Sequence, residues 1–261
     1  MKKFLKVVLM LTLVMSLAIP LASCGGSGEN KDSKKDETLV VGMEPTFPPF
    51  DAQDKKGNFE GFDVDLMNAI AKDQNLKIEF KQFEFDGLIP ALNSGNCDIV
   101  ASGMAIMKER KEKVDFTTGY FNSGLCLAVV QNNNSIKSVD ALTKEHILGA
   151  QIGTSGADTI KKLKEDGKIK DAKIYNKVDV AFQDLKNGTI DGIINDVPVT
   201  KEYINKQPGK VKIVGKKLNA ETYGLAVKKG NKALLDKLNT GLKNIKKNGT
   251  FDKLLKKWKL N

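Results

Sequence analysis

Metal-binding and nucleophilic side chains are scarce in this chain of 261 residues. It contains three cysteines, Cys24, Cys97 and Cys126, with no Cys-x-x-Cys spacing, and a single histidine, His146. A zinc site needs about four such ligands in closed geometry, so no metal site is expected. With one histidine, no set of nucleophile, base and orienting acid is visible either. We therefore expect neither a catalytic centre nor a cofactor.

Prolines are few and long apolar runs are absent after the first residues. Seven prolines, 41% hydrophobic residues and 28% charged residues are typical of a globular chain, not of a disordered or collagen-like one. The length suits one large domain or two modest ones. Because no long apolar segment follows the N-terminal one, the chain cannot itself form a membrane channel.

The charge is basic, with a formal net charge of +10. Lys2, Lys3 and Lys6 lie in a segment expected to be removed, which would leave about +7. The remaining lysines are interspersed with Asp and Glu, a pattern that favours a solvated surface over a nucleic-acid or anionic membrane surface. No nucleic-acid partner is expected.

The N-terminus has the features of a secretory signal. The three lysines precede an apolar run from Val7 to about Ala22, which ends in Leu-Ala-Ser-Cys at residues 21–24. This ending resembles the bacterial lipobox, which implies a signal peptide at residues 1–23 and acylation (palmitate) at Cys24. An ordinary signal peptide or a retained helix is the alternative. Residues 25–37 contain no apolar side chain, so residues 24–37 are predicted to tether a domain to the outer face of the cell membrane.

From residue 38, apolar segments alternate with helical patterns. Strands are expected at residues 39–43, 77–83, 98–101, 124–130, 147–152, 174–175, 190–194, 211–214 and 223–227. Helices are expected after Gly61 and at residues 85–93, 155–163, 178–186, 197–204, 232–247 and 251–260. This order predicts an α/β protein with parallel-rich sheets, in which ligands bind at the carboxyl ends of strands.

Two α/β halves and a returning tail are visible. The tail, residues 220–261, has one strand and two helices but no complete unit, so we expect it to rejoin the first half. Lobe 1 would then comprise residues 38–125 and 220–261, and lobe 2 residues 126–219. The chain would cross between the lobes twice and so form a hinge.

Seven segments carry a family resemblance. They are residues 42–50 (GMEPTFPPF), 61–72 (GFDVDL and onward), 85–92 (FDGLIPAL), 98–110 with 114–117, 153–156 (GTSG), 195–198 (NDVP) and 248–252 (NGTFD). In this order they closely resemble the polar amino-acid-binding proteins of bacterial ABC importers, solute-binding protein family 3. The resemblance covers essentially everything from residue 38 to the end.

The resemblance implies a two-lobed venus-flytrap architecture (periplasmic binding protein type II) with two crossover strands as the hinge. It also implies a cleft that closes on one free amino acid, and delivery to the permease and ATPase subunits of an importer. An enzyme of the same fold, such as a dehydratase, and a surface lipoprotein without a transport role are the alternatives.

The resemblance assigns roles at the backbone end of the ligand. Arg110 is implied as the carboxylate clamp, because a guanidinium pairs with a carboxylate through two bonds; by composition alone it is one more surface cation. Thr154 and Ser155 are expected to donate to the same carboxylate; Thr or Ser could also cap a helix here, and both roles can hold together. Asp196 is the expected partner of the ammonium, or a helix cap before a proline.

Three residues of the central segment complete that end: Ser102, Gly103 and Ala105. Backbone groups at Gly103 and Ala105 are expected to hold the ligand. Many relatives have a hydroxyl residue where this chain has Ala105, so that contact would be lost or made by the backbone.

The residues expected around the side chain of the ligand do not identify one amino acid. Phe47 and Phe85 are expected to flank the ligand, and Glu44, Gln151 and Asn195 to contact its tip. Two aromatic rings and Glu44 suit a cation, whereas Gln151 and Asn195 suit an amide. Glutamine, arginine, lysine, histidine and cystine all stay open.

Other polar residues are assigned to structure. Asp63 and Asp65 are expected to serve a helix start, and His146 to lie in a loop. Cys97 and Cys126 are either disulfide-bonded or free and buried.

Overall fold

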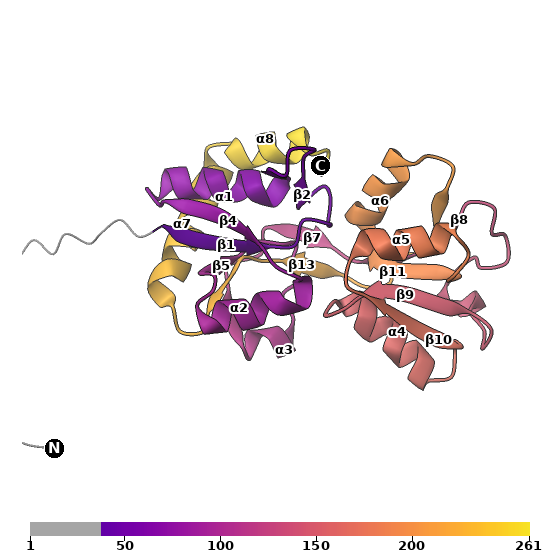
Figure 1. Cartoon of the computed structure of the whole chain (residues 1–261). Helices are drawn as coiled ribbons and strands as arrows, with labels where there is room; N and C mark the ends of the chain where they lie inside the picture. Colours follow the sequence, from indigo (N-terminus) through magenta and orange to yellow (C-terminus); the bar gives the residue numbers. More distant parts are fainter. Residues whose placement is uncertain (1–37) are drawn as a thin grey trace, which may run out of the picture. The chain divides into compact units, whose positions relative to one another are not determined.

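The computed structural model describes residues 38–261, which form two five-stranded sheets, a two-stranded ribbon that connects them and a small two-stranded hairpin (Figure 1). The predicted signal peptide, Cys24 and the tether lie outside the described residues.

The first sheet has the strand order β4-β1-β5-β14-β6. Its strands are β4 (Ile78–Gln82), β1 (Leu39–Met43), β5 (Ile99–Val100), β14 (Ala226–Lys228) and β6 (Val114–Phe116). Strand β1, the second in this order, is apolar and pairs in parallel with β4 and β5, whereas β14 is antiparallel to both of its neighbours. A strand from the end of the chain is therefore inserted between two strands from its first half.

The second sheet has the order β10-β9-β11-β8-β12. Its strands are β10 (Asp171–Tyr175), β9 (Ile147–Gln151), β11 (Gly192–Asp196), β8 (Leu125–Val130) and β12 (Val211–Val214). The pairs of β9 with β10 and β11 are parallel, and those of β8 with β11 and β12 are antiparallel. All five strands come from one continuous stretch of chain.

A ribbon of two antiparallel strands carries both crossings between the sheets. The chain leaves the first sheet through β7 (Phe121–Ser123) and returns through β13 (Glu221–Tyr223), and these two strands pair with each other. The prediction of an α/β fold with two lobes and two crossover strands is confirmed.

Helices cover both faces of each sheet (Figure 1). On the first sheet, α1 (Phe62–Asp73) belongs to one apolar core, while α2 (Leu88–Ser94), after the short 3₁₀ turn η1 (Phe85–Gly87), belongs to another. On the second, α4 (Ser155–Glu165) packs into one core and α5 (Val178–Lys186) and α6 (Val197–Lys206) into another. The smaller elements are β2 (Ala52–Gln53), β3 (Phe59–Glu60), α3 (Lys108–Lys111) and the 3₁₀ turn η2 (Val139–Ala141).

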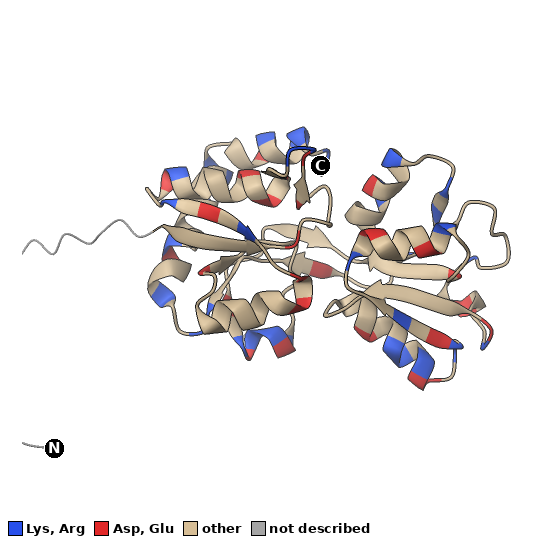
Figure 2. Ribbon diagram, in the orientation of Figure 1, with Lys and Arg blue, Asp and Glu red and all other residues tan. Residues whose placement is uncertain are grey.

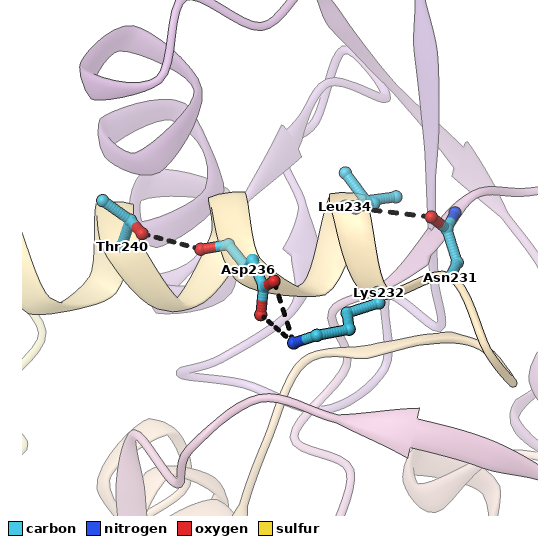
Figure 3. Close-up of polar contacts among 5 residues, drawn as sticks. All are labelled: Asn231, Lys232, Leu234, Asp236 and Thr240. Carbon is cyan, nitrogen blue, oxygen red and sulfur yellow. Dashed lines mark hydrogen bonds and ion pairs between the residues drawn. The ribbon is translucent and has the colours of Figure 1, made fainter.

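The C-terminal helices α7 (Lys232–Lys247) and α8 (Thr250–Lys257) pack against α1. Helix α7 begins at Asn231, whose side-chain oxygen accepts the Leu234 amide at 3.3 Å, and continues with a Lys232–Asp236 ion pair at 3.0 Å (Figure 3). Asp65 of α1 accepts bonds from Lys257 at 2.6 Å and Trp258 at 2.7 Å. Asp65 thus ties α8 to α1 and does not cap its own helix.

Local differences from the sequence prediction have physical causes. The strand predicted at residues 223–227 is two strands, because the chain leaves the hinge ribbon after Tyr223 and enters the first sheet at Ala226. Gly224 lies between them, where a Cβ atom would come within 2.8 Å of Ile106. Cys97 and Cys126 are both free and buried, so the disulfide alternative is wrong. His146 lies in a loop, as expected.

Charged side chains of both signs alternate over the helices of both sheets (Figure 2). Within residues 38–261, no helix has the length and apolar character needed to cross a membrane. The same part of the chain holds no group of His, Cys, Asp and Glu suited to a metal ion.

Candidate functional site

Glu44 lies just after β1 and is 1% exposed. Its carboxylate accepts the Thr46 hydroxyl at 2.7 and 2.9 Å, and its backbone N–H donates to the Ser102 hydroxyl at 3.0 Å. The Gln151 amide, at the end of β9 in the second sheet, donates to the same carboxylate at 3.2 Å. Burial raises the pKa of Glu44, and hydrogen bonds from Thr46 and Gln151 partly offset the rise. The bond between Glu44 and Gln151 thus links the two sheets.

Arg110 lies on α3 and is only 9% exposed, although Lys108, Lys111 and Lys113 beside it are exposed. Its guanidinium donates to the Ala105 carbonyl at 2.7 Å and to the Gly153 carbonyl, in the second lobe, at 2.9 Å. Two of its five N–H donors are used in these bonds, so others can serve an anion. Arg110 is therefore set apart from the surface cations of its segment.

The surroundings of Arg110 are acidic. Burial lowers the pKa of Arg110, while the carboxylates of Glu221, Asp196 and Asp158 oppose that shift. The guanidinium also lies over the Phe85 ring, 5.5 Å from its centroid. A surface hollow of about 370 Å³ reaches this edge of the site, and Phe85 and Arg110 form part of its wall.

Asp196 ends β11 and precedes α6, yet its side chain makes no capping bond to that helix. Its Oδ1 instead accepts the Ser123 hydroxyl at 3.2 Å and a short hydrogen bond from the Tyr223 hydroxyl. These partners lie on β7 and β13, the two crossing strands. The Asp196 carboxylate therefore does not cap α6, and the helix-cap alternative is wrong for its side chain.

Burial raises the pKa of Asp196 to about 7, against the lowering effects of Tyr223, Ser123 and Arg110. Arg110 and Asp196 shift the pKa of each other, and both are buried. Two buried groups of opposite charge, from different lobes, therefore interact with each other.

The side chain of Asp63 binds the backbone of the turn at residues 102–105. Its Oδ2 accepts the Gly103 amide at 2.7 Å and the Tyr120 hydroxyl at 2.8 Å. Gly103 has φ +52°, and a Cβ atom there would lie 2.6 Å from the Phe47 ring. Asp63 was expected to serve the start of α1; it lies in the first turn but binds these two distant groups instead. The local helix-dipole argument missed this long-range contact.

The turn before α4 uses Thr154 as a helix cap. The Thr154 hydroxyl accepts the Ala157 amide at 3.1 Å and donates to the Gln151 carbonyl at 2.7 Å. The capping alternative is confirmed for Thr154, and Ser155 follows half-buried as the first residue of the helix. Gly153 has φ +73°, and a Cβ atom there would lie 3.0 Å from the side chain of Asp86 in the first lobe. The two lobes approach closely at this glycine.

Of the remaining candidates, Phe47, Phe85 and Gln151 lie near the other site residues, whereas Asn195 does not. Phe47 and Phe85 are buried near the other residues, and Phe47 packs on Tyr223 with ring centroids 6.4 Å apart. Gln151 also donates to the Asn176 carbonyl, and its own side-chain oxygen is buried without a partner in the described structure. Asn195 donates to Thr200 of α6 at 3.3 Å. Because side chains alternate along β11, Asn195 faces away from Asp196 and is not brought together with the others.

Sequence reasoning missed several residues around this site. They are Thr46, Asp51, Tyr120, Ser123, Glu221 and Tyr223. Five of them, all except Thr46, lie in or beside strands of two or three residues, which have too few positions to show a period. For the residues of the crossing strands, the sequence offered one signal of a role in the site: a polar or tyrosine side chain in a segment expected to cross between the lobes.

The fold and this geometry define a two-lobed binding protein of the type II periplasmic class. Residues 39–261 match the bacterial extracellular solute-binding proteins, family 3, and the chain belongs to that family.

Individual relatives are similar over most of their length. A probable histidine-binding protein of Neisseria gonorrhoeae is 36% identical over 246 residues, covering 92% of this chain and 91% of the relative. An ancestral arginine-binding protein bound to arginine is 45% identical with a TM-score of 0.81, covering 85% of this chain and 97% of the other. An ancestral arginine-binding protein bound to glutamine has the same identity and coverage and a TM-score of 0.79.

Proposed function

We propose that this protein is the extracytoplasmic substrate-binding component of an amino-acid ABC importer, and that it captures a polar or basic L-amino acid between its lobes. One observation carries the proposal: Arg110 and Asp196, of opposite charge, are both buried, interact electrostatically and come from different lobes. Relatives named for binding histidine or arginine support it.

The backbone end of the amino acid is held between the lobes. Arg110 pairs with the carboxylate through N–H donors not used by Ala105 and Gly153, and Ser155 adds a hydroxyl at the start of α4. Asp196 takes the ammonium, together with backbone groups of the turn at residues 102–105. An ammonium buried without such a partner would be costly.

The side-chain end favours a cation over an amide. Glu44 is buried, and none of the groups that shift its pKa is a cation. A ligand ammonium or guanidinium would supply the missing charge, with the Phe47 and Phe85 rings nearby. The unpaired oxygen of Gln151 adds an acceptor for the same group. Arginine, lysine and histidine are thus preferred over glutamine.

Closure follows from contacts made by both lobes. A ligand that binds groups of both lobes has more contacts in the closed form, and only that difference in affinity shifts the equilibrium towards closure. The closed form delivers the amino acid to the permease and ATPase subunits. The lobes are residues 38–125 with 220–261, and residues 126–219.

The chain is anchored by its N-terminus. Residues 1–23 direct export and are removed, Cys24 carries the lipid, and residues 24–37 tether the two lobes to the outer face of the cell membrane. Mass spectrometry of the membrane-extracted protein tests this: a diacylglyceryl and acyl adduct on Cys24 is expected, and an unmodified chain starting at Met1 contradicts it.

A thermal-shift screen of residues 25–261 against the twenty amino acids, ornithine and cystine tests the binding function. A ligand that binds only the folded state raises the melting temperature. A rise with basic amino acids is expected, and no rise with any compound contradicts the proposal. Mass spectrometry of the recovered ligand separates binding from catalysis, since an enzyme would return a changed compound.

Glu44→Gln tests the side-chain assignment. The variant keeps the shape of Glu44 but removes its charge, so arginine affinity should fall about tenfold or more while glutamine affinity changes little. Glu79→Gln, on an exposed side chain of β4 that is not among the groups shifting the pKa of Glu44, is the matched control. Equal losses for both ligands would contradict the role of Glu44.

A further inference from the structure

The side chain of Asp51 is a buried acid with no hydrogen bond in the part of the chain that the structure describes. Asp51 directly follows the segment of residues 42–50, and its backbone pairs with Phe47 in both directions at 3.0 Å, so its place is fixed. The residue is 0% exposed, and neither carboxylate oxygen has a hydrogen-bond partner within residues 38–261. A buried carboxylate without a partner is costly, so its presence beside the site needs a reason.

Within residues 38–261, the titratable groups that act on Asp51 come from several elements, and none of them is a cation. Glu44 after β1 and Asp63 on α1 add negative charge, and Tyr120 before β7 lies within electrostatic range. The Ser102 hydroxyl is near and offsets part of the effect, although its oxygen already accepts the Glu44 amide and the pair does not reach hydrogen-bond geometry. Three carboxyl groups thus share one dry region.

Three neighbouring carboxylates cannot all be charged at low cost in such a region. Burial, followed by the nearby charges of Asp63 and Glu44, raises the pKa of Asp51 well above its ordinary value. Burial also raises the pKa of Asp63 to about 7, although Gly103 and Tyr120 hold its charged form. In the empty site the cluster therefore retains protons near neutral pH.

We propose that Asp51 is a specificity-determining residue: a cationic ligand side chain beside Glu44 releases the proton of Asp51, whereas an amide side chain leaves it in place. This inference rests on the proposed function, since it requires the ligand side chain to lie next to Glu44. The carboxyl O–H of Asp51 breaks and its proton passes to the buffer, while the ligand cation offsets the negative charge that remains.

The pH dependence has a definite sign. Because binding of a cation releases a proton, the affinity for arginine increases with pH until the cluster is already ionised in the empty site. Binding of glutamine releases no proton from the cluster, so its affinity lacks this contribution. The preference for arginine over glutamine consequently grows as pH rises.

Calorimetry of the wild type and of Asp51→Asn with arginine and with glutamine tests the inference. Titrations in phosphate and in Tris, whose ionisation enthalpies differ, count the protons released, at about pH 6 and about pH 8. The wild type should release up to about one more proton with arginine than with glutamine. In Asp51→Asn this excess should disappear, and the arginine-to-glutamine affinity ratio should fall about tenfold, equivalent to one pKa unit.

Asp54→Asn is the matched control, because it makes the same exchange on a solvated carboxylate just beyond β2. Should Asp51→Asn not fold, Asp51→Ser removes the carboxyl with a smaller side chain. An excess proton that persists in the Asp51 variants would come from Glu44 or Asp63, and would overturn the assignment. An unchanged affinity ratio, or no excess proton in the wild type, would also overturn it. Absence of any amino-acid binding would instead refute the proposed function.

Discussion

Replacement of Arg110 is the sharpest test of the proposed grip on the ligand. Arg110→Ala removes the buried guanidinium together with its bonds to the carbonyls of Ala105 and Gly153. Arg110→Lys keeps the charge but not the planar fork. The two variants therefore separate the contribution of charge from that of geometry.

The expected losses can be estimated from the contacts. Truncation of one member of a buried, hydrogen-bonded charge pair costs about 2–5 kcal/mol, which corresponds to about 30- to 5,000-fold in Kd. For Arg110→Lys, loss of the two-pronged bond should weaken binding about 10- to 100-fold. The alanine variant also leaves the buried Ala105 carbonyl without its donor, at a cost of about 1–3 kcal/mol, and relieves the burial of a charge. Stability should therefore change much less than affinity.

Isothermal titration calorimetry with the strongest ligand of the thermal-shift screen measures the affinities, and circular dichroism melting measures the stability. Lys108→Ala is the control, because it removes an exposed cation of the same helix. An Arg110→Ala variant that folds and binds within about threefold of the wild type would refute the clamp, since that loss is below 1 kcal/mol.

Three further outcomes are expected. Gly153→Ala should weaken ligand binding about tenfold or more and give a less compact liganded state in X-ray scattering, because a Cβ atom would meet the opposite lobe at 3.0 Å. Gly188→Ala, with a similar φ of +74° but open space, isolates the backbone strain, and equal effects in both would contradict the steric argument. Tyr223→Phe removes a bond that lowers the pKa of Asp196, so this pKa should rise above about 7 and binding should weaken near neutral pH and recover at higher pH; a carboxyl NMR titration checks it. The ligand-free protein should lose stability as pH rises from 3.8, the ordinary pKa of Asp63, to about 7, its pKa in the folded state, because the folded state binds the extra proton. Denaturant titrations at several pH values measure the free energy of unfolding, and in Asp63→Asn this free energy should fall less steeply with pH.

Elements with a clear period were predicted well from the sequence. Helix α5 and helix α7 begin and end where their apolar spacing predicts, because each buries one face against a sheet or another helix. The hinge strands β7 and β13 were not separately recognised, because their pairing joins residues about a hundred positions apart. Pairing between such distant residues produces no recognisable pattern in the sequence of a three-residue strand.

The candidate site was predicted unevenly for a similar reason. Composition alone made Arg110 a surface cation, and only the order of the motifs singled it out; the structure buries it among exposed lysines. Asp63 was assigned by its place in a helix, but Gly103 and Tyr120 are its partners. Asp51 had no signal at all, because the sequence does not reveal which carboxylates are buried together. Helix position is a local property, whereas burial depends on the whole fold.

The insertion of β14 between β5 and β6 has a consequence for the order of assembly during synthesis. All strands of the second sheet have emerged once Val214 is made, so that lobe can complete first. The first sheet cannot join β5 to β6 until Lys228 appears, and α1 gains its cover of α7 and α8 only with the last residues. A nascent chain therefore carries an open strand edge until late, and a chain truncated before β14 should aggregate although its second lobe is intact.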